Sequence, residues 1–298
     1  MARPFADRLI EKTRALGPLC VGIDPHPGMF PKLFGQPSAG SIAVWADGII
    51  EAAAGQVACI KPQAAFFELW GSPGMAALEH VCKTARDAGL LVILDAKRGD
   101  IGSTAKGYAD AYLGENAACP CDVLTVNPYM GLETLTPFID ASESQGRGIA
   151  ALTRTSNPGA ADIQELEVDG EPIYLRMARE FQAAGARLKG KDSPWSGLMM
   201  VSGATAPEEA RRIRDAAPDN LLLVPGYGAQ GAGADAAVSG FVPVNGMLEG
   251  GVVNASRSVT FPEKAQSAGT IEDWQAAIRE AIAFAQDDLT KATRRNLS

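Results

Sequence analysis

The sequence has few histidines, few cysteines and no long apolar run, and each shortage excludes a class of protein. The chain of 298 residues holds two histidines and five cysteines. Two histidines are too few for a histidine metal cluster, and an odd number of dispersed cysteines does not make a disulfide framework. No stretch reaches the roughly 18 apolar residues that a membrane helix needs. We therefore expect no metal site, no membrane partner and a reducing compartment, the cytoplasm.

Basic charge is also in short supply. Lys plus Arg number 27 against 35 Asp plus Glu, which gives a net charge of −8. Nucleic-acid binding needs a basic face, so this balance argues against a nucleic-acid partner. The beginning of the chain, residues 1–8, shows no apolar run after its charged residues, so we expect no secretory signal.

Short apolar runs alternate with helical stretches along the whole chain. The runs are continuous rather than alternating, as is typical of parallel strands that are buried on both faces. The predicted strands are 19–23, 57–60, 90–94, 122–126, 148–152, 197–201, 221–224 and 250–253. The predicted helices are 5–15, 41–54, 75–88, 103–116, 131–140, 172–188, 207–216, 231–238 and 271–288.

Eight strands that alternate with helices indicate a (β/α)8 barrel. We predict that residues 1–298 form one α/β domain of this kind, with a doubly wound open sheet as the structural alternative. Long connections at 25–40, 153–171 and 225–249 follow the first, fifth and seventh strands. In a barrel they would lie on the C-terminal face, where active sites sit.

Charged residues follow three consecutive apolar runs. Asp24 follows the first strand, Lys61 the second, and Asp95 and Lys97 the third. Isolated buried charges are costly, so these side chains are expected to pair. One interpretation is a structural ion-pair network; the other is an active site, because strand ends of a barrel converge on one pocket. Such an array would keep a lysine charged as a proton donor beside carboxylates.

The third of these strands begins a longer motif. Residues 92–105 read Val-Ile-Leu-Asp-Ala-Lys-Arg-Gly-Asp-Ile-Gly-Ser-Thr-Ala and resemble the signature of the orotidine 5′-phosphate decarboxylase family. Residues 19–25, 60–63, 225–230 and 254–257 fit the same family, in an order and spacing similar to its longer bacterial subfamily. Ala232 departs from the family, which usually has glycine there.

The resemblance implies a homodimeric (β/α)8 barrel that converts orotidine 5′-monophosphate to UMP and CO2 without a metal or an organic cofactor. It implies that Lys61, Asp95, Lys97 and Asp100 form a catalytic array. Lys97 would protonate C6, Asp95 would lie against the substrate carboxylate, and Asp100 would enter from the partner subunit.

The resemblance also implies a set of substrate contacts. These are Asp24 and Lys61 for the ribose hydroxyls, Ile101 for the base pocket, Thr104 for the ribose, Ser156 for the pyrimidine amide, and Gln230 and Arg257 for the phosphate.

Other functions stay open on the residues alone. Gly226-Tyr227-Gly228-Ala229-Gln230-Gly231 matches a dinucleotide fingerprint, with Glu249 at the distance of a ribose-binding acid. We interpret it as a monophosphate loop because it belongs to the seventh βα unit rather than the first. A related barrel that acts on a sugar phosphate with magnesium, and an inactive nucleotide-binding barrel, are the remaining alternatives.

Overall fold

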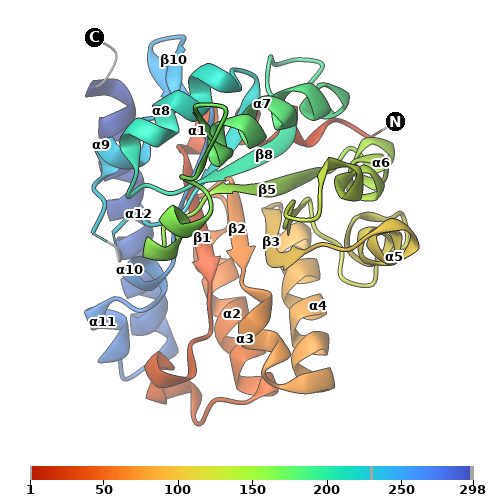
Figure 1. Cartoon of the computed structure of the whole chain (residues 1–298). Helices are drawn as coiled ribbons and strands as arrows, with labels where there is room; N and C mark the ends of the chain where they lie inside the picture. Colours follow the sequence, from red (N-terminus) through yellow and green to blue (C-terminus); the bar gives the residue numbers. More distant parts are fainter. Residues whose placement is uncertain (1, 229–230, 296–298) are drawn as a thin grey trace.

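Eight parallel strands close into one barrel in the computed structural model, which describes residues 2–228 and 231–295 (Figure 1). Around the barrel the strands follow the order β1-β12-β9-β8-β5-β4-β3-β2. They are β1 Leu19–Ile23, β2 Cys59–Pro62, β3 Leu91–Arg98, β4 Val123–Val126, β5 Gly148–Arg154, β8 Ser196–Ser202, β9 Asn220–Val224 and β12 Gly251–Ala255. The predicted (β/α)8 fold is confirmed, and each of the eight predicted strands corresponds to one barrel strand.

Helices surround the barrel (Figure 1). They are α1 Phe5–Leu16, α2 Ala39–Ala53, α3 Ala64–Glu68, α4 Gly71–Asp87, α5 Gly102–Leu113, α6 Thr136–Gln145, α7 Ile173–Gly185, α8 Pro207–Ala216, α9 Ala234–Ala237, α10 Arg257–Thr260, α11 Glu263–Gln266 and α12 Ile271–Arg295. None of the described helices is long and apolar enough to cross a membrane.

The strands divide the core into two layers. One cluster fills the barrel interior and includes Cys20, Cys59, Leu91 and Ile93. It also contains Phe5, Leu9 and Ile10 of α1, which therefore lies against the N-terminal end of the barrel interior. The other cluster lies between the strands and the outer helices. Side chains alternate between the two layers because successive residues of a strand point to opposite faces.

Two of the long connections contain hairpins that the sequence analysis did not predict. β6 Glu167–Val168 pairs with β7 Glu171–Pro172 across Asp169 and Gly170, both of which have positive φ. β10 Val242–Val244 pairs with β11 Met247–Glu249 across Asn245 and Gly246 in the same manner. Such turns favour Asn-Gly and Asp-Gly pairs. The β10–β11 hairpin lies at the N-terminal end of the barrel, directly before β12, so only the first half of 225–249 borders the C-terminal mouth (Figure 1).

One buried arginine holds the N-terminal end of the barrel together. Arg214 of α8 donates to the carbonyl oxygens of Gly240 (2.8 Å), Ala217 (3.3 Å), Pro218 (2.9 Å), Asn220 (2.7 Å) and Gly250 (2.9 Å). Burial lowers its pKa to about 9, so the guanidinium is charged at neutral pH. These carbonyls belong to the first residue of β9 and to segments that precede β9 and β12, which Arg214 therefore ties to α8.

We predict that Arg214→Leu destabilises the protein by about 3 kcal/mol or more, because several buried carbonyls lose their donor. Urea unfolding followed by circular dichroism measures the loss. Arg211→Leu on the same helix is the matched control, since Arg211 is exposed and pairs with Glu208 at the surface. It is expected to cost less than about 1 kcal/mol. Equal losses in the two variants would contradict this account of Arg214.

Candidate active site

The charged residues of the first three strands meet because they share the inward phase of each strand. Cys20 and Cys59 belong to the interior cluster, and so do Leu91 and Ile93. Counting on by twos places Asp24, Lys61 and Asp95 on the same inner face, beyond the last apolar layer. They therefore gather at the C-terminal mouth of the barrel.

Asp95 is the centre of this cluster. Lys61 Nζ donates to its Oδ2 at 3.0 Å, and Lys97 Nζ donates to its Oδ1 at 2.6 Å. Gln63 Nε2 (2.9 Å) and Thr125 Oγ1 (3.1 Å) donate to the two carboxylate oxygens as well. The Asp95 side chain, which is only 12% exposed, thus accepts four hydrogen bonds from four different side chains.

The charges of this cluster persist at neutral pH. Burial alone would raise the pKa of the Asp95 carboxyl, but Lys61 and Lys97 hold that pKa below its usual range. Burial would likewise lower the pKa of Lys61, but Asp95 and Asp24 raise it above its usual value. Asp95 therefore contributes to folding stability until the pH falls below the ordinary pKa of an aspartate. Lys61 contributes to it until the pH rises above the ordinary pKa of a lysine.

Lys97 differs from Lys61 in exposure and backbone. Its side chain is 48% exposed, against 6% for Lys61, so it reaches the open part of the site. Lys97 has a φ of 50°, and the β3–β4 register shifts between Leu94 and Arg98. Thr125 Oγ1 accepts hydrogen bonds from the backbone N–H groups of Ala96 (2.9 Å) and Lys97 (2.8 Å), which holds this bulge in place.

Sequence reasoning missed Thr125 and Gln63. Thr125 is a polar residue inside the apolar run of β4, and it is 1% exposed. Gln63 lies two residues beyond Lys61 and, like Lys61, binds Asp95. A polar residue within a buried strand was the signal that could have found the threonine.

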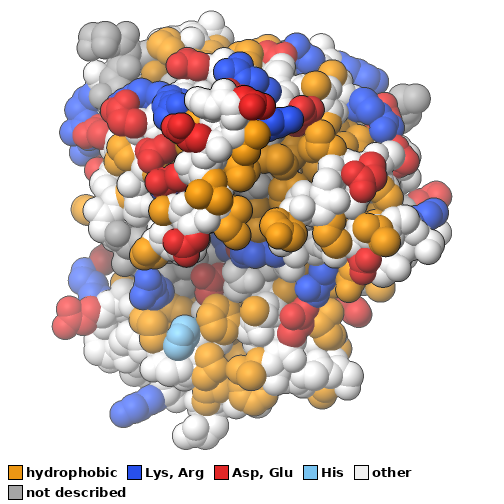
Figure 2. Space-filling model, viewed as in Figure 1, with side chains coloured by type: hydrophobic (Ala, Val, Ile, Leu, Met, Phe, Trp, Pro, Cys, Tyr) orange, Lys and Arg blue, Asp and Glu red, His pale blue; other side chains and the backbone are white. Residues whose placement is uncertain are grey.

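A cavity of about 220 Å³ opens beside the cluster. It is lined by Lys61, Asp95, Lys97, Thr125, Leu152, Thr155, Ser156, Asn157, Val201, Leu223 and Pro225. The face of the molecule seen in Figure 2 has a central hollow bordered by hydrophobic side chains. Ser156 reaches the cavity because Gly203 follows β8: a Cβ at Gly203 would lie 2.9 Å from Ser156 Cβ.

Asp24 lies at the edge of the same cluster. Its Oδ1 is 3.9 Å from Lys61 Nζ, a longer ion pair than the one between Lys61 and Asp95. This oxygen is buried and accepts no hydrogen bond from a described residue. Asp24 therefore has an acceptor to offer to a ligand.

Three of the residues identified from the sequence lie apart from this cavity. Asp100, Ile101 and Thr104 follow β3 and begin α5, and none of them lines it. Asp100 Oδ1 accepts a hydrogen bond from Ile101 N–H at 2.8 Å, a local contact. Ile101 is 62% exposed. Within the described part of one chain, no hydrogen bond or ion pair joins these three side chains to the Asp95 cluster.

The predicted phosphate contacts follow β9 and β12. Arg257 is exposed and begins α10, directly after Ser256. Ser256 packs on β1 because Gly22 leaves room for it: a Cβ at Gly22 would lie 1.9 Å from Ser256 Oγ. Gln230 lies outside the described residues. The carbonyl oxygen of Ala232 accepts a hydrogen bond from Gly228 N–H at 3.0 Å.

Glu249 is not placed to act as the ribose-binding acid of a dinucleotide site. Glu249 is 5% exposed and lies at the other end of the barrel. Its Oε2 accepts from Arg14 Nε at 2.6 Å, and its Oε1 accepts from Trp195 Nε1 at 2.7 Å. It is thus a structural ion-pair partner of α1, remote from the glycine loop.

Comparison with known proteins finds relatives of this chain that share one name. A curated protein of Rhodopirellula baltica named orotidine 5′-phosphate decarboxylase is 42% identical over 88% of this chain and 90% of its own length. One of Deinococcus radiodurans with the same name is 38% identical over 95% and 98%. The solved structure of Leishmania donovani OMP decarboxylase has a TM-score of 0.78 at 29% identity, covering 97% of this chain and 99% of its own.

The family profile spans almost the whole barrel. The profile described as the orotidine 5′-phosphate decarboxylase / HUMPS family matches residues 17–270, which begin two residues before β1 and end at the residue before α12. With this match and these relatives, the chain belongs to the orotidine 5′-phosphate decarboxylase / HUMPS family.

Proposed function

We propose that this barrel, as a single domain of a cytoplasmic homodimer, decarboxylates orotidine 5′-monophosphate to UMP and CO2, with Lys97 as the proton donor. The enzyme class, a carboxy-lyase of pyrimidine biosynthesis, follows from the family and from the names of the relatives. The observation that supports the chemistry is the Asp95 carboxylate, which is held ionised between two lysines at the barrel mouth.

The reaction breaks the bond between C6 and the carboxylate carbon, and the electron pair stays on C6. Lys97 carries a proton that it can give to this carbon, and its side chain is exposed toward the open part of the site. Asp95 is the negative group that would face the substrate carboxylate and disfavour it relative to the neutral CO2. Lys61 balances that charge from the buried side, so the site is organised before the substrate arrives.

No organic electron sink is part of this proposal, so electrostatic interactions and substrate binding energy must lower the barrier instead. Enzymes lower reaction barriers by about 8–23 kcal/mol. The phosphate, held by Gln230 and Arg257, would supply binding energy remote from the reacting carbon. Asp24 and Lys61 would hold the ribose hydroxyls, and Ser156 would read the pyrimidine amide from its place in the cavity wall.

The second family activity requires a separate test. The family description also includes HUMPS, and the sequence left open a magnesium-dependent barrel that acts on a sugar phosphate. Lys61 from β2 and Ser156 in the cavity wall favour the decarboxylase. An ultraviolet assay of orotidine 5′-monophosphate disappearance, run with and without a chelator, distinguishes the two. No turnover of this nucleotide, or turnover that a chelator abolishes, would contradict the proposal.

The homodimer proposal has its own support. Ile101, Tyr108, Tyr129 and Met130 are exposed, and Tyr129 is 81% exposed. They belong to α5 and to the segments that follow β3 and β4, next to Asp100. An apolar group of this kind is typical of a protein interface. A partner docked there would bury it and could bring Asp100, Ile101 and Thr104 to the partner's cavity.

Lys97→Ala is predicted to abolish decarboxylation, with kcat falling by at least about 10³-fold, because the carbanion loses its proton donor. The ultraviolet assay measures the rate, and circular dichroism checks that the fold is retained. Lys291→Ala, which removes an exposed lysine paired with Asp287 on α12, is the control for loss of charge. Turnover close to wild type in Lys97→Ala would rule out the proton-donor role.

Arg257→Ala is predicted to raise KM by about tenfold to a hundredfold, because a charge-assisted contact with the phosphate is lost. A smaller fall in kcat is expected, since phosphate binding also positions the reacting end. Steady-state kinetics separate the two effects. If orotidine 5′-monophosphate binds the variant as tightly as wild type, the phosphate assignment of Arg257 is wrong.

Mixing two inactive variants tests the shared site. Lys97→Ala and Asp100→Ala subunits are combined and allowed to exchange. If Asp100 acts across the interface, each mixed dimer has one site with both defects and one intact site. Half of randomly paired dimers are mixed, so activity should return to about one quarter of wild type. Exchange verified with tagged subunits, without recovered activity, would argue against two independent shared sites.

A further inference from the structure

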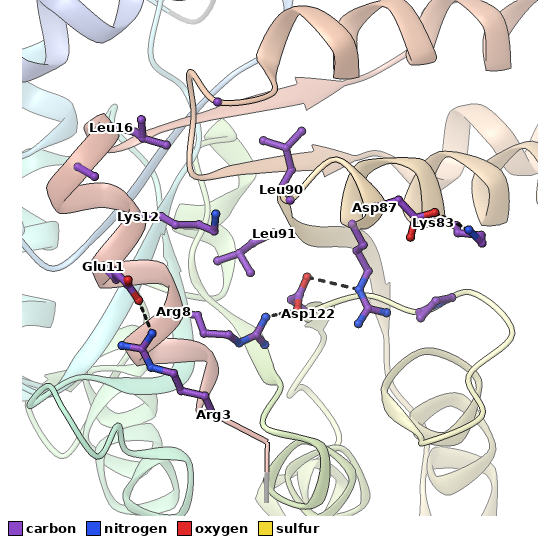
Figure 3. A pocket seen from close by; sticks show the side chains of 15 residues that line it. Arg3, Arg8, Glu11, Lys12, Leu16, Lys83, Asp87, Leu90, Leu91 and Asp122 are labelled. Carbon is purple, nitrogen blue, oxygen red and sulfur yellow. Dashed lines mark hydrogen bonds and ion pairs between the residues drawn. The ribbon is translucent and has the colours of Figure 1, made fainter.

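A second, larger cavity lies at the N-terminal end of the barrel. Its volume is about 930 Å³, and its walls come from α1, the end of α4 and the segments that begin β3 and β4 (Figure 3). Leu91 lines it at the start of β3, whereas Lys97 lines the candidate active site near the end of the same strand. At about 3.3 Å per residue, the two cavities are roughly 20 Å apart.

Basic side chains predominate in this N-terminal cavity. Five basic residues line it, namely Arg3, Arg8, Lys12, Lys83 and Arg86. Three acidic residues line it as well, namely Glu11, Asp87 and Asp122. The excess of positive charge contrasts with the net charge of −8 of the whole chain. The cavity therefore has a positive electrostatic potential that attracts anions.

A buried carboxylate fixes the arginines at the base of the cavity. Asp122, with a side chain 3% exposed, accepts from Arg8 Nη1 at 2.7 Å and lies 4.0 Å from Arg86 Nε. Val92 N–H also donates to Asp122 at 2.9 Å, so the carboxylate cannot turn away. Burial, with repulsion from Arg86 and Arg8, holds the pKa of neighbouring Arg147 below its ordinary value. Arg8 and Arg86 thus share one buried carboxylate, which Arg8 binds at the shorter distance.

Two of the cations keep donors for a ligand. Lys12 is half-buried and makes no hydrogen bond or ion pair within the described part of the chain, and Figure 3 shows it between Arg8 and Leu16 at the cavity wall. Arg86 reaches Asp122 only at the 4.0 Å limit of an ion pair, from Nε, which leaves its two terminal nitrogens without a described partner. The other lining cations, by contrast, pair with Glu11, Asp122 or Asp87.

The remaining lining suits the carbon part of a small molecule. Leu16, Leu90, Leu91 and Pro120 supply apolar surface beside the cations. Ligand pockets typically measure about 300–1,000 Å³ and combine apolar walls with a few placed polar groups. A cavity of this size and lining accommodates a ring system as well as a charged group.

We infer that this cavity is a second binding site, which takes a phosphomonoester of nucleotide size. Lys12 and the terminal nitrogens of Arg86 bind the phosphate dianion, whose two charges match the local excess. Leu90 and Leu91 contact the apolar part of the ligand. The site is independent of the proposed decarboxylation, because it shares no lining residue with the C-terminal cavity.

AMP is a suitable probe, since it is a phosphomonoester with a purine that differs from the pyrimidine of the proposed substrate. Calorimetric titration of AMP into the whole protein is run for wild type and for Lys12→Ala/Arg86→Ala. Arg211→Ala/Lys291→Ala is the matched control, because it removes one exposed arginine and one exposed lysine elsewhere. Arg257→Ala tests for binding at the proposed active site instead. Thermal melts check that each variant is folded.

The expected result is saturable AMP binding that Lys12→Ala/Arg86→Ala weakens at least tenfold. The control pair and Arg257→Ala should stay within about twofold of wild type, and raising the salt concentration should weaken binding. Adenosine, which lacks the phosphate, should bind at least tenfold more weakly than AMP. The inference is overturned if wild type does not bind AMP, if Lys12→Ala/Arg86→Ala binds it normally, if Arg257→Ala abolishes binding, or if adenosine binds equally well.

Discussion

The Asp95 carboxylate is the constraint on which the arrangement of this site depends. It is nearly buried, and a lone buried charge would cost several kcal/mol. Lys61, Lys97, Gln63 and Thr125 offset that cost with four hydrogen bonds, which come from β2 and the residue after it, from the bulge of β3 and from β4. The need to satisfy this one group therefore fixes the positions of both lysines relative to each other before any substrate is present.

The bulge in β3 places the Lys97 side chain through an unfavourable backbone conformation. Lys97 adopts a left-handed backbone conformation, which costs a non-glycine residue about 1–2 kcal/mol. Thr125 Oγ1 stabilises it through two backbone N–H groups and also donates to Asp95. One hydroxyl thus links the backbone shape of β3 to the charge of the site, and the lysine remains half exposed as a result.

The two ends of the barrel use charge differently. At the C-terminal mouth, opposite charges alternate around Asp95 and leave Asp24 with an open acceptor. At the N-terminal end, Arg214 spans several carbonyls and Glu249 is held by Arg14 and Trp195. These contacts fix strand connections rather than a ligand. The cations around Asp122 are the exception there, because Lys12 and Arg86 keep donors that the protein does not use.

The sequence by itself determined the barrel, because buried parallel strands require continuous apolar runs and each run corresponds to one strand of the structure. It also located Asp24, Lys61, Asp95 and Lys97, because a charged residue directly after a buried strand lies at the mouth of the barrel. Only the tertiary structure decided that Thr125 and Gln63 complete the cluster, that Glu249 belongs to the opposite end, and that Asp100 does not line its own chain's cavity. The first two outcomes depend on contacts between residues 30 or more positions apart, and no local pattern specifies which distant groups a closed barrel brings together.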